Sequence, residues 1–338
     1  MTYKHTLKEV AARAGVSYQT VSKVLNGQAQ VSNETRQRIM DAVHELRYRP
    51  NQVARNMRAR RSRMIGYSWT ETLPSHDHHF VDQFLSSIVH KAEILDYYLL
   101  LFPFRDGAAQ VDDYGELFYT GRVDGFILSN VNHDDQRIRF LVEHKISFVA
   151  FGRSNLELDF PHVDVDSADG IRQVMQHLIS RGHRRIAVIE LPEDSHLGNE
   201  RLRGFFESME ANGLEVRAAW IRHGEGTYEF GYEAASGMIE LPASERPTAI
   251  VTSNDTQAIA VFQAAREHGL EMPRDIAVVG FGDEPVSRYL CPSLTTISLP
   301  ISDSGRKCIE ILITSMEGEQ PEERHILLQP KLIVRDSA

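Results

Sequence analysis

The sequence has little cysteine and no long apolar run, and each shortage argues against a class of protein. Two cysteines, Cys291 and Cys308, among 338 residues are too few for a disulfide-built fold, so a reducing cytosol is the simplest interpretation. The densest apolar stretch, residues 97–104, has the length of a strand and falls well below the roughly 18 residues of a membrane span. Residues 1–10 lack the apolar segment of a secretory signal. We therefore expect a cytoplasmic protein with no membrane partner.

Recognisable catalytic and cofactor motifs are also missing. The sequence contains no G-x-S-x-G or Walker pattern, and Gly-Phe-Gly at residues 280–282 is only a fragment of a dinucleotide fingerprint. The run His-Asp-His-His at residues 76–79 lacks the ligand spacing of a structural zinc site. We therefore expect a protein that is not an enzyme and uses neither a metal nor a cofactor.

Charge is divided unevenly along the chain. The apolar fraction of 42% and the charged fraction of 25% are those of an ordinary globular protein, and the length suggests two or three domains. The net charge is −10, yet residues 1–63 hold 13 basic and 4 acidic residues, a net of +9, which leaves −19 for the rest. This division favours a basic module fused to an acidic domain. A solvated basic face without a partner is the alternative.

The basic segment has the pattern of three short helices. Residues 6–9, T-x-x-E, form a capping box, and apolar residues follow Leu7 at helical spacing up to the stop at Gly15. Ser17 can cap a second helix over residues 18–25, and Ser32 can cap a third. Two helices joined by a tight turn, with a third for support, make a helix-turn-helix arrangement.

The second of these helices has a face suited to reading bases. Val21 and Val24 point inward, which places Tyr18, Gln19 and Lys23 on other faces. Glutamine can bond adenine and lysine can bond guanine in the major groove, where the N-terminal end of such a helix lies. The pattern therefore favours double-stranded DNA as a partner, and a solvated polar stripe is the alternative.

Several motifs at fixed spacing resemble the headpiece of the LacI/GalR family of bacterial transcription regulators. They are L-K-E-V-A at 7–11, A-G-V-S at 14–17, T-V-S-K-V-L-N-G at 20–27 and L-R-Y-R-P-N at 46–51. The resemblance implies that base edges are read by Tyr18, Gln19 and Lys23. It also implies phosphate contacts by Thr6, Ser17, Thr20, Asn26, Ser32 and Tyr48.

A basic linker follows Pro50. A helix over residues 51–60 is marginal by itself, and its arginines repel one another, so we expect this segment to be disordered in the free protein and to fold on DNA. The family resemblance implies a hinge helix that enters the minor groove, with Met57 wedged between base pairs. The implied minor-groove residues are Asn51, Val53, Ala54 and Met57. An ordinary basic linker is the alternative.

The acidic remainder alternates strand-length apolar runs with helical patterns, which predicts an α/β fold with doubly wound parallel sheets in two lobes. The expected strands are 64–67, 98–102, 125–129, 147–151, 185–189, 249–252 and 276–280. The expected helices include 81–95, 171–181, 201–212, 256–268 and 304–318. A ligand is expected in the cleft between the lobes, near the carboxyl ends of the strands.

The LacI/GalR resemblance continues through this region, for example in V-D-G-F-I-L-S at 123–129, G-H-R-R-I-A at 182–187 and R-L-R-G-F at 201–205. It implies a helix-turn-helix headpiece (1–50), a hinge (51–62) and a two-lobed, periplasmic-binding-protein-like effector domain (63–338). The N-lobe is expected at about 63–162 and 292–326, and the C-lobe at about 163–291 and 327–338.

Sugars require planar bidentate hydrogen bonds and an aromatic face, which directs attention to Asp, Asn, Arg and aromatic residues near the expected cleft. Family members place an effector-binding arginine at the position of Arg201, and an aromatic residue at that of Phe80. Gly152 and Gly282 stand where many members carry an aspartate, so the neighbouring Arg153 and Asp283 are expected to replace that polarity. The expected effector residues are His79, Phe80, Ser129, Arg153, Asp166, Arg201, Asn254, Asp255 and Asp283.

Three of these expectations have structural alternatives. Asp255 can cap a helix, Asp166 can start one, and Trp69, a weaker candidate for the aromatic face, can pack in the core. With these alternatives open, we expect a dimeric repressor that binds a near-palindromic operator. Its effector is expected to be a neutral sugar or glycoside, with room for more than a monosaccharide. A sugar carrier or an enzyme built on the same lobes is the alternative.

Overall fold

A computed structural model describes residues 5–25, 30–48, 61–69, 78–105, 107–155 and 157–338. The contacts divide the chain into two compact units, Met1–Ser62 and Arg63–Ala338, which we call the headpiece unit and the body. No helix in the described part of the chain is long and apolar enough to cross a membrane.

The headpiece unit contains three helices, α1 (Leu7–Ala14), α2 (Tyr18–Leu25) and α3 (Asn33–Glu45). Gly15 ends α1 with a φ of +68°, a left-handed conformation that glycine adopts without strain, and the chain turns directly into α2. The buried side chains come from all three helices and form one small core. The predicted helix-turn-helix arrangement is therefore confirmed.

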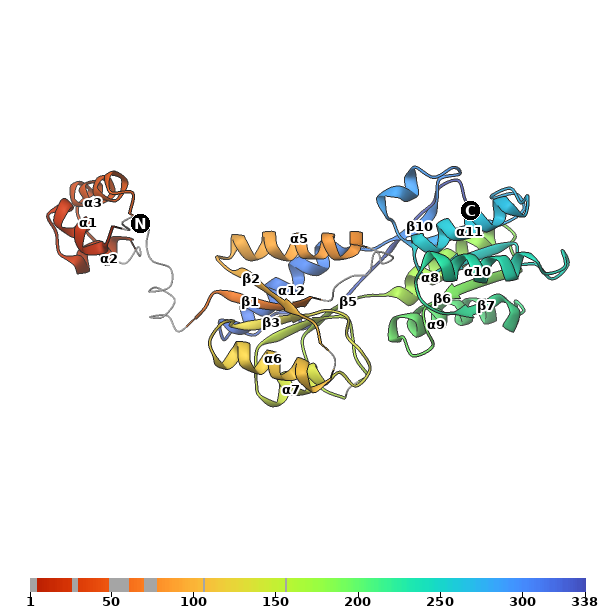
Figure 1. The fold of residues 1–338 in the computed structure, drawn as a ribbon, viewed down its shortest axis with the longest axis horizontal. Helices are drawn as coiled ribbons and strands as arrows, with labels where there is room; N and C mark the ends of the chain where they lie inside the picture. The colour runs from red at the N-terminus through yellow and green to blue at the C-terminus, as the bar shows by residue number, and fades with distance from the viewer. Residues whose placement is uncertain (1–4, 26–29, 49–60, 70–77, 106, 156) are drawn as a thin grey trace. The chain divides into compact units, whose positions relative to one another are not determined.

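The body contains two six-stranded sheets, one in each lobe (Figure 1). The N-lobe sheet, in the order β11-β5-β4-β3-β1-β2, consists of β1 (Met64–Trp69), β2 (Tyr98–Pro103), β3 (Gly125–Leu128), β4 (Phe148–Phe151), β5 (His162–Val165) and β11 (His325–Leu328). The C-lobe sheet, in the order β12-β10-β9-β8-β6-β7, consists of β6 (Ile186–Glu190), β7 (Ile221–His223), β8 (Ala249–Thr252), β9 (Ala277–Gly282), β10 (Thr295–Ser298) and β12 (Lys331–Ile333). Paired strands run parallel, except that β12 is antiparallel to β10. The predicted doubly wound α/β class is confirmed.

Helices cover both faces of each sheet (Figure 1). In the N-lobe, α5 (His78–Ile94) and α12 (Ile301–Met316) cover one face, and α6 (Ala108–Tyr119) and α7 (Gln136–Glu143) cover the other. In the C-lobe, α8 (Ser167–Ser180) and α9 (His196–Ala211) cover one face, and α10 (Tyr228–Ile239) and α11 (Asp255–Glu267) cover the other. Because both faces are covered, inner strands such as β3 and β4 read as continuous apolar runs.

The chain crosses between the lobes later than expected at each of the three predicted boundaries. β5 belongs to the N-lobe sheet as far as Val165, whereas the boundary was expected near residue 162. β10 pairs with β9 in the C-lobe sheet, so the crossing expected near residue 291 follows Ser298. β11 pairs with β5 as far as Leu328, so the last crossing follows it and not residue 326. The observed crossings differ from the expected ones because a short strand joins the sheet with which it can pair. The composition of the strand does not reveal which sheet that is.

The two lobes fill their cores differently. The N-lobe core is rich in large rings, including those of Tyr97, Tyr114, Phe84 and Phe126. The C-lobe core beneath α10 and α11 is rich in alanine, contributed mainly by these two helices. The close approach of α8 and α9 depends on Gly204, where a Cβ would lie 2.4 Å from the carbonyl oxygen of Ala168.

Candidate DNA-binding and effector-binding sites

The headpiece helices begin at exposed hydroxyl side chains. The Thr6 hydroxyl accepts from the Glu9 N–H at 3.4 Å, while the Glu9 carboxylate accepts from the Thr6 N–H at 2.6 Å, which completes the predicted capping box. The Ser17 hydroxyl accepts from the Thr20 N–H at 3.1 Å, and the Ser32 hydroxyl caps α3 in the same way. Three of the expected phosphate contacts therefore lie at helix N-termini, where backbone N–H groups and the helix dipole favour an anion.

α2 presents one buried and one exposed face. Val21 is fully buried and Val24 nearly so, both within the core of the headpiece. Tyr18, Gln19 and Lys23 are exposed, with Tyr18 exposed to 37%. The three expected base-reading side chains thus lie on the solvent side of α2. Their contact with bases stays a prediction.

Other DNA-contact candidates differ in their placement. Tyr48 is only 8% exposed and packs in the headpiece core, so little of its surface is open to a phosphate. Thr20 is half-buried, and its hydroxyl lies 2.8 Å from that of Ser17. Five candidates fall outside the described residues: Asn26, Asn51, Val53, Ala54 and Met57.

In the body, Arg153 joins the two lobes. It follows β4 and Gly152, whose φ of +108° suits glycine, and its Nε donates to the Asp164 carboxylate of β5 at 2.6 Å. Its Nη2 reaches the Glu200 carboxylate of α9, in the C-lobe, at 3.3 Å. The Arg153 side chain remains 34% exposed. A planar guanidinium held between two carboxylates can exchange one of them for paired oxygens of a ligand.

Two histidines also meet across the lobes. The rings of His133 and His196 lie edge to face with their centroids 4.9 Å apart. Burial lowers the pKa of His196, and the neighbouring His133 lowers it further. Together with the Arg153 contact, this pair marks where polar groups of the two lobes converge.

Arg201 is buried at the ends of three C-lobe strands. Its Nη1 donates to the Ser253 carbonyl at 2.7 Å, and its guanidinium carbon lies 3.8 Å from the centroid of the Phe281 ring. Nη1 also lies 3.8 Å from a carboxylate oxygen of Glu190. The Arg201 Nε is buried and has no hydrogen-bond partner among the described residues, so one donor remains for a ligand oxygen.

Glu190 is the buried acid beneath Arg201. It ends β6, is 1% exposed, and accepts a hydrogen bond from the Leu191 N–H at 2.9 Å. Burial raises its pKa to about 7, and the attraction of Arg201 opposes that rise. A carboxyl with a pKa near neutrality at a strand end is a common feature of binding sites.

Asp255, an expected effector residue, is enclosed by hydrogen bonds within the C-lobe, and its contact with an effector stays a prediction. Its side chain is fully buried and accepts hydrogen bonds from the Ser287 and Thr296 hydroxyls, each at 2.6 Å, and from the Glu284 N–H at 2.7 Å. Burial raises its pKa, while these hydrogen bonds lower it. No surface of Asp255 is left for a ligand, and its carboxylate instead ties α11 to the loop after β9 and to β10. The helix cap at this point is Asn254 and not Asp255.

Three further candidates are already paired. Asn254 accepts from the Gln257 N–H at 2.8 Å and donates to the Gly226 carbonyl at 2.8 Å. Asp166 caps the N-terminus of α8, which agrees with the helix-starting role given as its alternative. Asp283 forms an ion pair with Arg335 at 2.5 Å. These side chains lie at strand ends, as expected, but a ligand would have to replace an existing bond to use them.

The remaining candidates lie in the N-lobe. The Ser129 hydroxyl forms a hydrogen bond of 2.7 Å with the buried Tyr67 hydroxyl. The half-buried Phe80 ring lies 5.7 Å from that of Phe151, and His79 lies one residue earlier on α5, 2.6 Å from the Gln83 side chain. Trp69 packs against the core beneath α5 and α12, which supports its core-packing alternative.

The sequence analysis missed Glu190, Asp164, Glu200, His133 and His196. Glu190 could have been predicted from the sequence, because it is an acid at the end of a buried strand. Asp166 was singled out by the same criterion. Glu200 and His196 had none, since only the packing of α9 brings them to the N-lobe.

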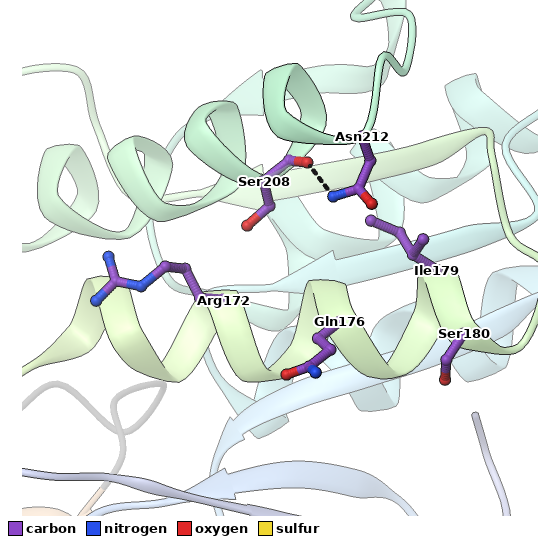
Figure 2. Close-up of a pocket in the computed structure, with 6 residues that line it drawn as sticks. All are labelled: Arg172, Gln176, Ile179, Ser180, Ser208 and Asn212. Carbon is purple, nitrogen blue, oxygen red and sulfur yellow. Dashed lines mark hydrogen bonds between the residues drawn. The ribbon is translucent and has the colours of Figure 1, made fainter.

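A separate groove of about 400 Å³ lies on the C-lobe between α8 and α9 (Figure 2). It is lined by Arg172, Gln176, Ile179 and Ser180 of α8 and by Ser208 and Asn212 of α9. None of the expected effector residues lines it. In the described part of the chain, no group of three or more His, Cys, Asp or Glu side chains is arranged to hold a metal ion.

Comparison with known proteins identifies both units. Residues 6–51 match the model of bacterial regulatory proteins of the lacI family, and residues 175–338 match that of a periplasmic binding protein-like domain. The chain is 32% identical over 338 residues to the HTH-type transcriptional regulator CelR of Thermobifida fusca, covering 98% of each chain.

Solved structures agree with this assignment. A regulatory protein of the LacI family from Chloroflexus aggregans is 49% identical, with a TM-score of 0.79, over 82% of this chain and 98% of that one. A CelR–cellobiose complex is 31% identical, with a TM-score of 0.74, over 99% and 100% of the two chains. A lac repressor dimer bound to operator and the anti-inducer ONPF is 28% identical, with a TM-score of 0.84, over 99% of each chain. With the helix-turn-helix headpiece and the two-lobed body, these matches show that the chain belongs to the LacI family of bacterial transcription regulators.

Proposed function

We propose that this regulator is a dimeric repressor that binds operator DNA through its headpiece and is controlled by a neutral sugar or glycoside held between the lobes. The observation that carries the effector assignment is the partly exposed side chain of Arg153, held between Asp164 of the N-lobe and Glu200 of the C-lobe. A ligand that bonds these groups changes the contact between the lobes, and therefore binds their arrangements with different affinity, as allosteric control requires.

The chemistry of this junction suits a sugar. Paired carboxylate and guanidinium groups form bidentate bonds with neighbouring hydroxyls, and the Phe80 and Phe151 rings supply an apolar surface. Both signs of charge are present, so no net charge is required of the ligand. The cellobiose bound by the related CelR supports a sugar larger than a monosaccharide.

The DNA-binding proposal rests on the exposed face of α2 and the capped helix ends. Tyr18, Gln19 and Lys23 read bases, and the N-termini capped by Thr6, Ser17 and Ser32 hold phosphates. The net charge of +9 over residues 1–63 supports this assignment. The repressor role is supported by the lac repressor, whose structure on operator aligns with nearly the whole chain.

The dimer proposal rests on apolar side chains that the body leaves exposed. Tyr98 and Leu101 on the edge strand β2 are 57% and 52% exposed, Ile94 of α5 is 64% exposed, and Tyr289 of the C-lobe is 79% exposed. Exposed rings and aliphatic side chains of this size are typical of protein interfaces. The related lac repressor was solved as a dimer.

A ligand screen with an operator readout tests the effector proposal. Cellobiose, other neutral sugars, phosphorylated sugars and purines would be compared by thermal shift, and each hit added to the full chain on labelled operator DNA. We expect a neutral sugar to raise the melting temperature and to change operator affinity by about 5- to 150-fold. A response confined to purines or phosphorylated sugars would sink the proposal. Recovery of the sugar unchanged separates a regulator from an enzyme.

A matched pair of arginine variants locates the site. Arg153→Gln removes the guanidinium at the junction, and Arg324→Gln removes an exposed one that pairs with Asp159 elsewhere in the N-lobe. We expect the first to weaken sugar binding at least tenfold, because two or more charge-assisted bonds are lost, and the second to leave it unchanged. Equal effects of the two changes would place the ligand elsewhere.

A further inference from the structure

Three residues at the ends of neighbouring C-lobe strands lie on the same face of the sheet. Along β6, Ile186 and Val188 pack beneath α8 and α9, so the alternation of the strand places Glu190 on that face as well. Phe281 of β9 packs in the same cluster, and β8 leads into Ser253 beside them. The Arg201 side chain, from α9, contacts all three of these residues.

The Arg201 guanidinium is thereby held from several directions. Phe281 lies against its face at 3.8 Å, the Ser253 carbonyl accepts at 2.7 Å, and the Glu190 carboxyl lies 3.8 Å away. Both charged side chains are almost completely buried. Among the described residues Glu190 is the acid that faces Arg201 inside the lobe, and the bridging carboxylates Asp164 and Glu200 contact Arg153 instead.

From this arrangement we propose that Glu190 determines the charge class of the effector. Its carboxylate compensates the positive charge of Arg201, so the C-lobe end of the site accepts uncharged hydroxyl groups and rejects phosphorylated or carboxylated sugars. Glu190 acts through Arg201 and is a positioning residue, and the inference rests on the proposed function that places a neutral sugar between the lobes.

The physical basis is the interaction of two anions with one cation. A ligand anion bonded to the Arg201 guanidinium would lie within a few ångströms of the Glu190 carboxylate, and the two negative charges repel strongly because both side chains are buried. A neutral hydroxyl avoids that repulsion and can still accept from the unpaired Arg201 Nε. Replacing Glu190 with a neutral side chain removes the repulsion and leaves the cation free for an anion.

Acidity gives the same change without a mutation. Because burial raises the Glu190 pKa to about 7, this group loses its charge as the pH falls from 8 to 6, and anion affinity should rise over that interval. His223, which is paired with Glu190 in the sheet register, and the His133–His196 pair are the histidines nearest this part of the C-lobe. Their contribution is common to the wild type and to variants at position 190.

The test uses sulfate as the anion probe, because its charge is constant between pH 6 and 8, and cellobiose as the neutral probe. Sulfate and cellobiose affinities would be measured by thermal shift and calorimetry on the full chain for the wild type, Glu190→Gln and Glu190→Asp. Glu210→Gln on the exposed face of α9 is the control with the same change of charge. We expect Glu190→Gln to gain at least tenfold in sulfate affinity at pH 8, and Glu190→Asp and the control to remain like the wild type.

The pH series separates a specificity role from a merely structural one. The wild type should gain sulfate affinity from pH 8 to pH 6 by several-fold more than Glu190→Gln does. Equal pH dependence, or no gain of sulfate binding in Glu190→Gln, would overturn the inference. If Glu190→Gln fails to fold, the same series on Glu190→Asp and the wild type decides. The sulfate affinity of Glu190→Asp should then rise at a lower pH than that of the wild type. Failure of cellobiose and every other neutral sugar to bind the wild type would overturn the proposed function alone.

Discussion

The two lobes share one strand order but stabilise it differently, both in their cores and in the charged side chains at their strand ends. The N-lobe core is built on aromatic rings, and its polar contact at the junction, Arg153, is partly exposed. The C-lobe core is built on alanine and closely packed helices, and its polar pair, Arg201 and Glu190, is buried. The N-lobe therefore offers groups that can change partners, while the C-lobe offers groups fixed in place. Binding strength and lobe closure would then depend more on the N-lobe, and ligand discrimination more on the C-lobe.

The largest effect should come from deleting a ring in the N-lobe core. Phe126 is fully buried, with its ring centroid 4.5 Å from that of Tyr114, so Phe126→Ala should lower the free energy of unfolding by about 3–5 kcal/mol. The same change at Phe206, which is 41% exposed in the C-lobe, should alter it by no more than about 0.5 kcal/mol. Urea unfolding followed by tryptophan fluorescence measures both. A similar loss in the two variants would contradict the aromatic-core description.

The buried acid of the C-lobe should make stability depend on pH. The Glu190 pKa rises from 4.5 in the unfolded chain to about 7 in the folded one, so its contribution is present below pH 4.5 and is lost as the pH rises through 7. That loss amounts to about 3 kcal/mol. Glu190→Gln should therefore gain stability relative to the wild type between pH 5 and pH 8. Urea unfolding of both proteins across this range is the measurement. If the free energy of unfolding depends on pH in the same way in both proteins, the raised pKa of Glu190 is contradicted.

The close helix packing of the C-lobe should be sensitive to one added methyl group. Gly204→Ala forces a Cβ against the Ala168 carbonyl oxygen and should cost about 1–3 kcal/mol as α8 and α9 separate. Gly237, on the exposed face of α10, has open space around its Cα, so Gly237→Ala should instead stabilise by about 0.5–1 kcal/mol. Thermal unfolding should show opposite signs for these two changes, and equal signs would refute the packing explanation.

The smallest effect on stability should come from removing the ion pair between Arg153 and Asp164 in the N-lobe. Arg153→Gln removes a partly exposed ion pair, so the free energy of unfolding should fall by less than about 1 kcal/mol. The same urea measurement checks this value. A loss of several kcal/mol would mean that Arg153 is as fixed as Arg201, and the distinction between the two lobes would fail.

Much of the fold could be predicted from the sequence because its strands are buried on both faces. Continuous apolar runs located β3, β8 and β9 within two residues at their starts. β5, with the sequence His-Val-Asp-Val, alternates polar and apolar residues and was missed, as were β7, β10, β11 and β12. The crossings between lobes were misplaced for the same reason, because the partner of a short strand is chosen by tertiary pairing.

The site was predicted less completely than the fold. Polar residues at strand ends were found by their position, but position does not reveal whether a side chain turns toward a ligand or toward the core. Asp255 turns inward because hydroxyls 32 and 41 residues away in the chain complement its carboxylate. Arg153 was found, whereas its C-lobe partner Glu200 depends on how α9 packs against the other lobe.

The three crossings of the chain also order events during synthesis. α12, which covers one face of the N-lobe sheet, emerges only after the C-lobe strands β6 to β10 have been made. At about 5–20 residues per second, roughly 8–30 seconds separate the end of β5 from the end of α12. Throughout that interval the nascent N-lobe has an uncovered apolar surface that includes Ile127 and Val149. The lobe that begins first is thus finished only after most of the other has been made, and a chaperone that shields this surface would act before the ribosome reaches residue 316.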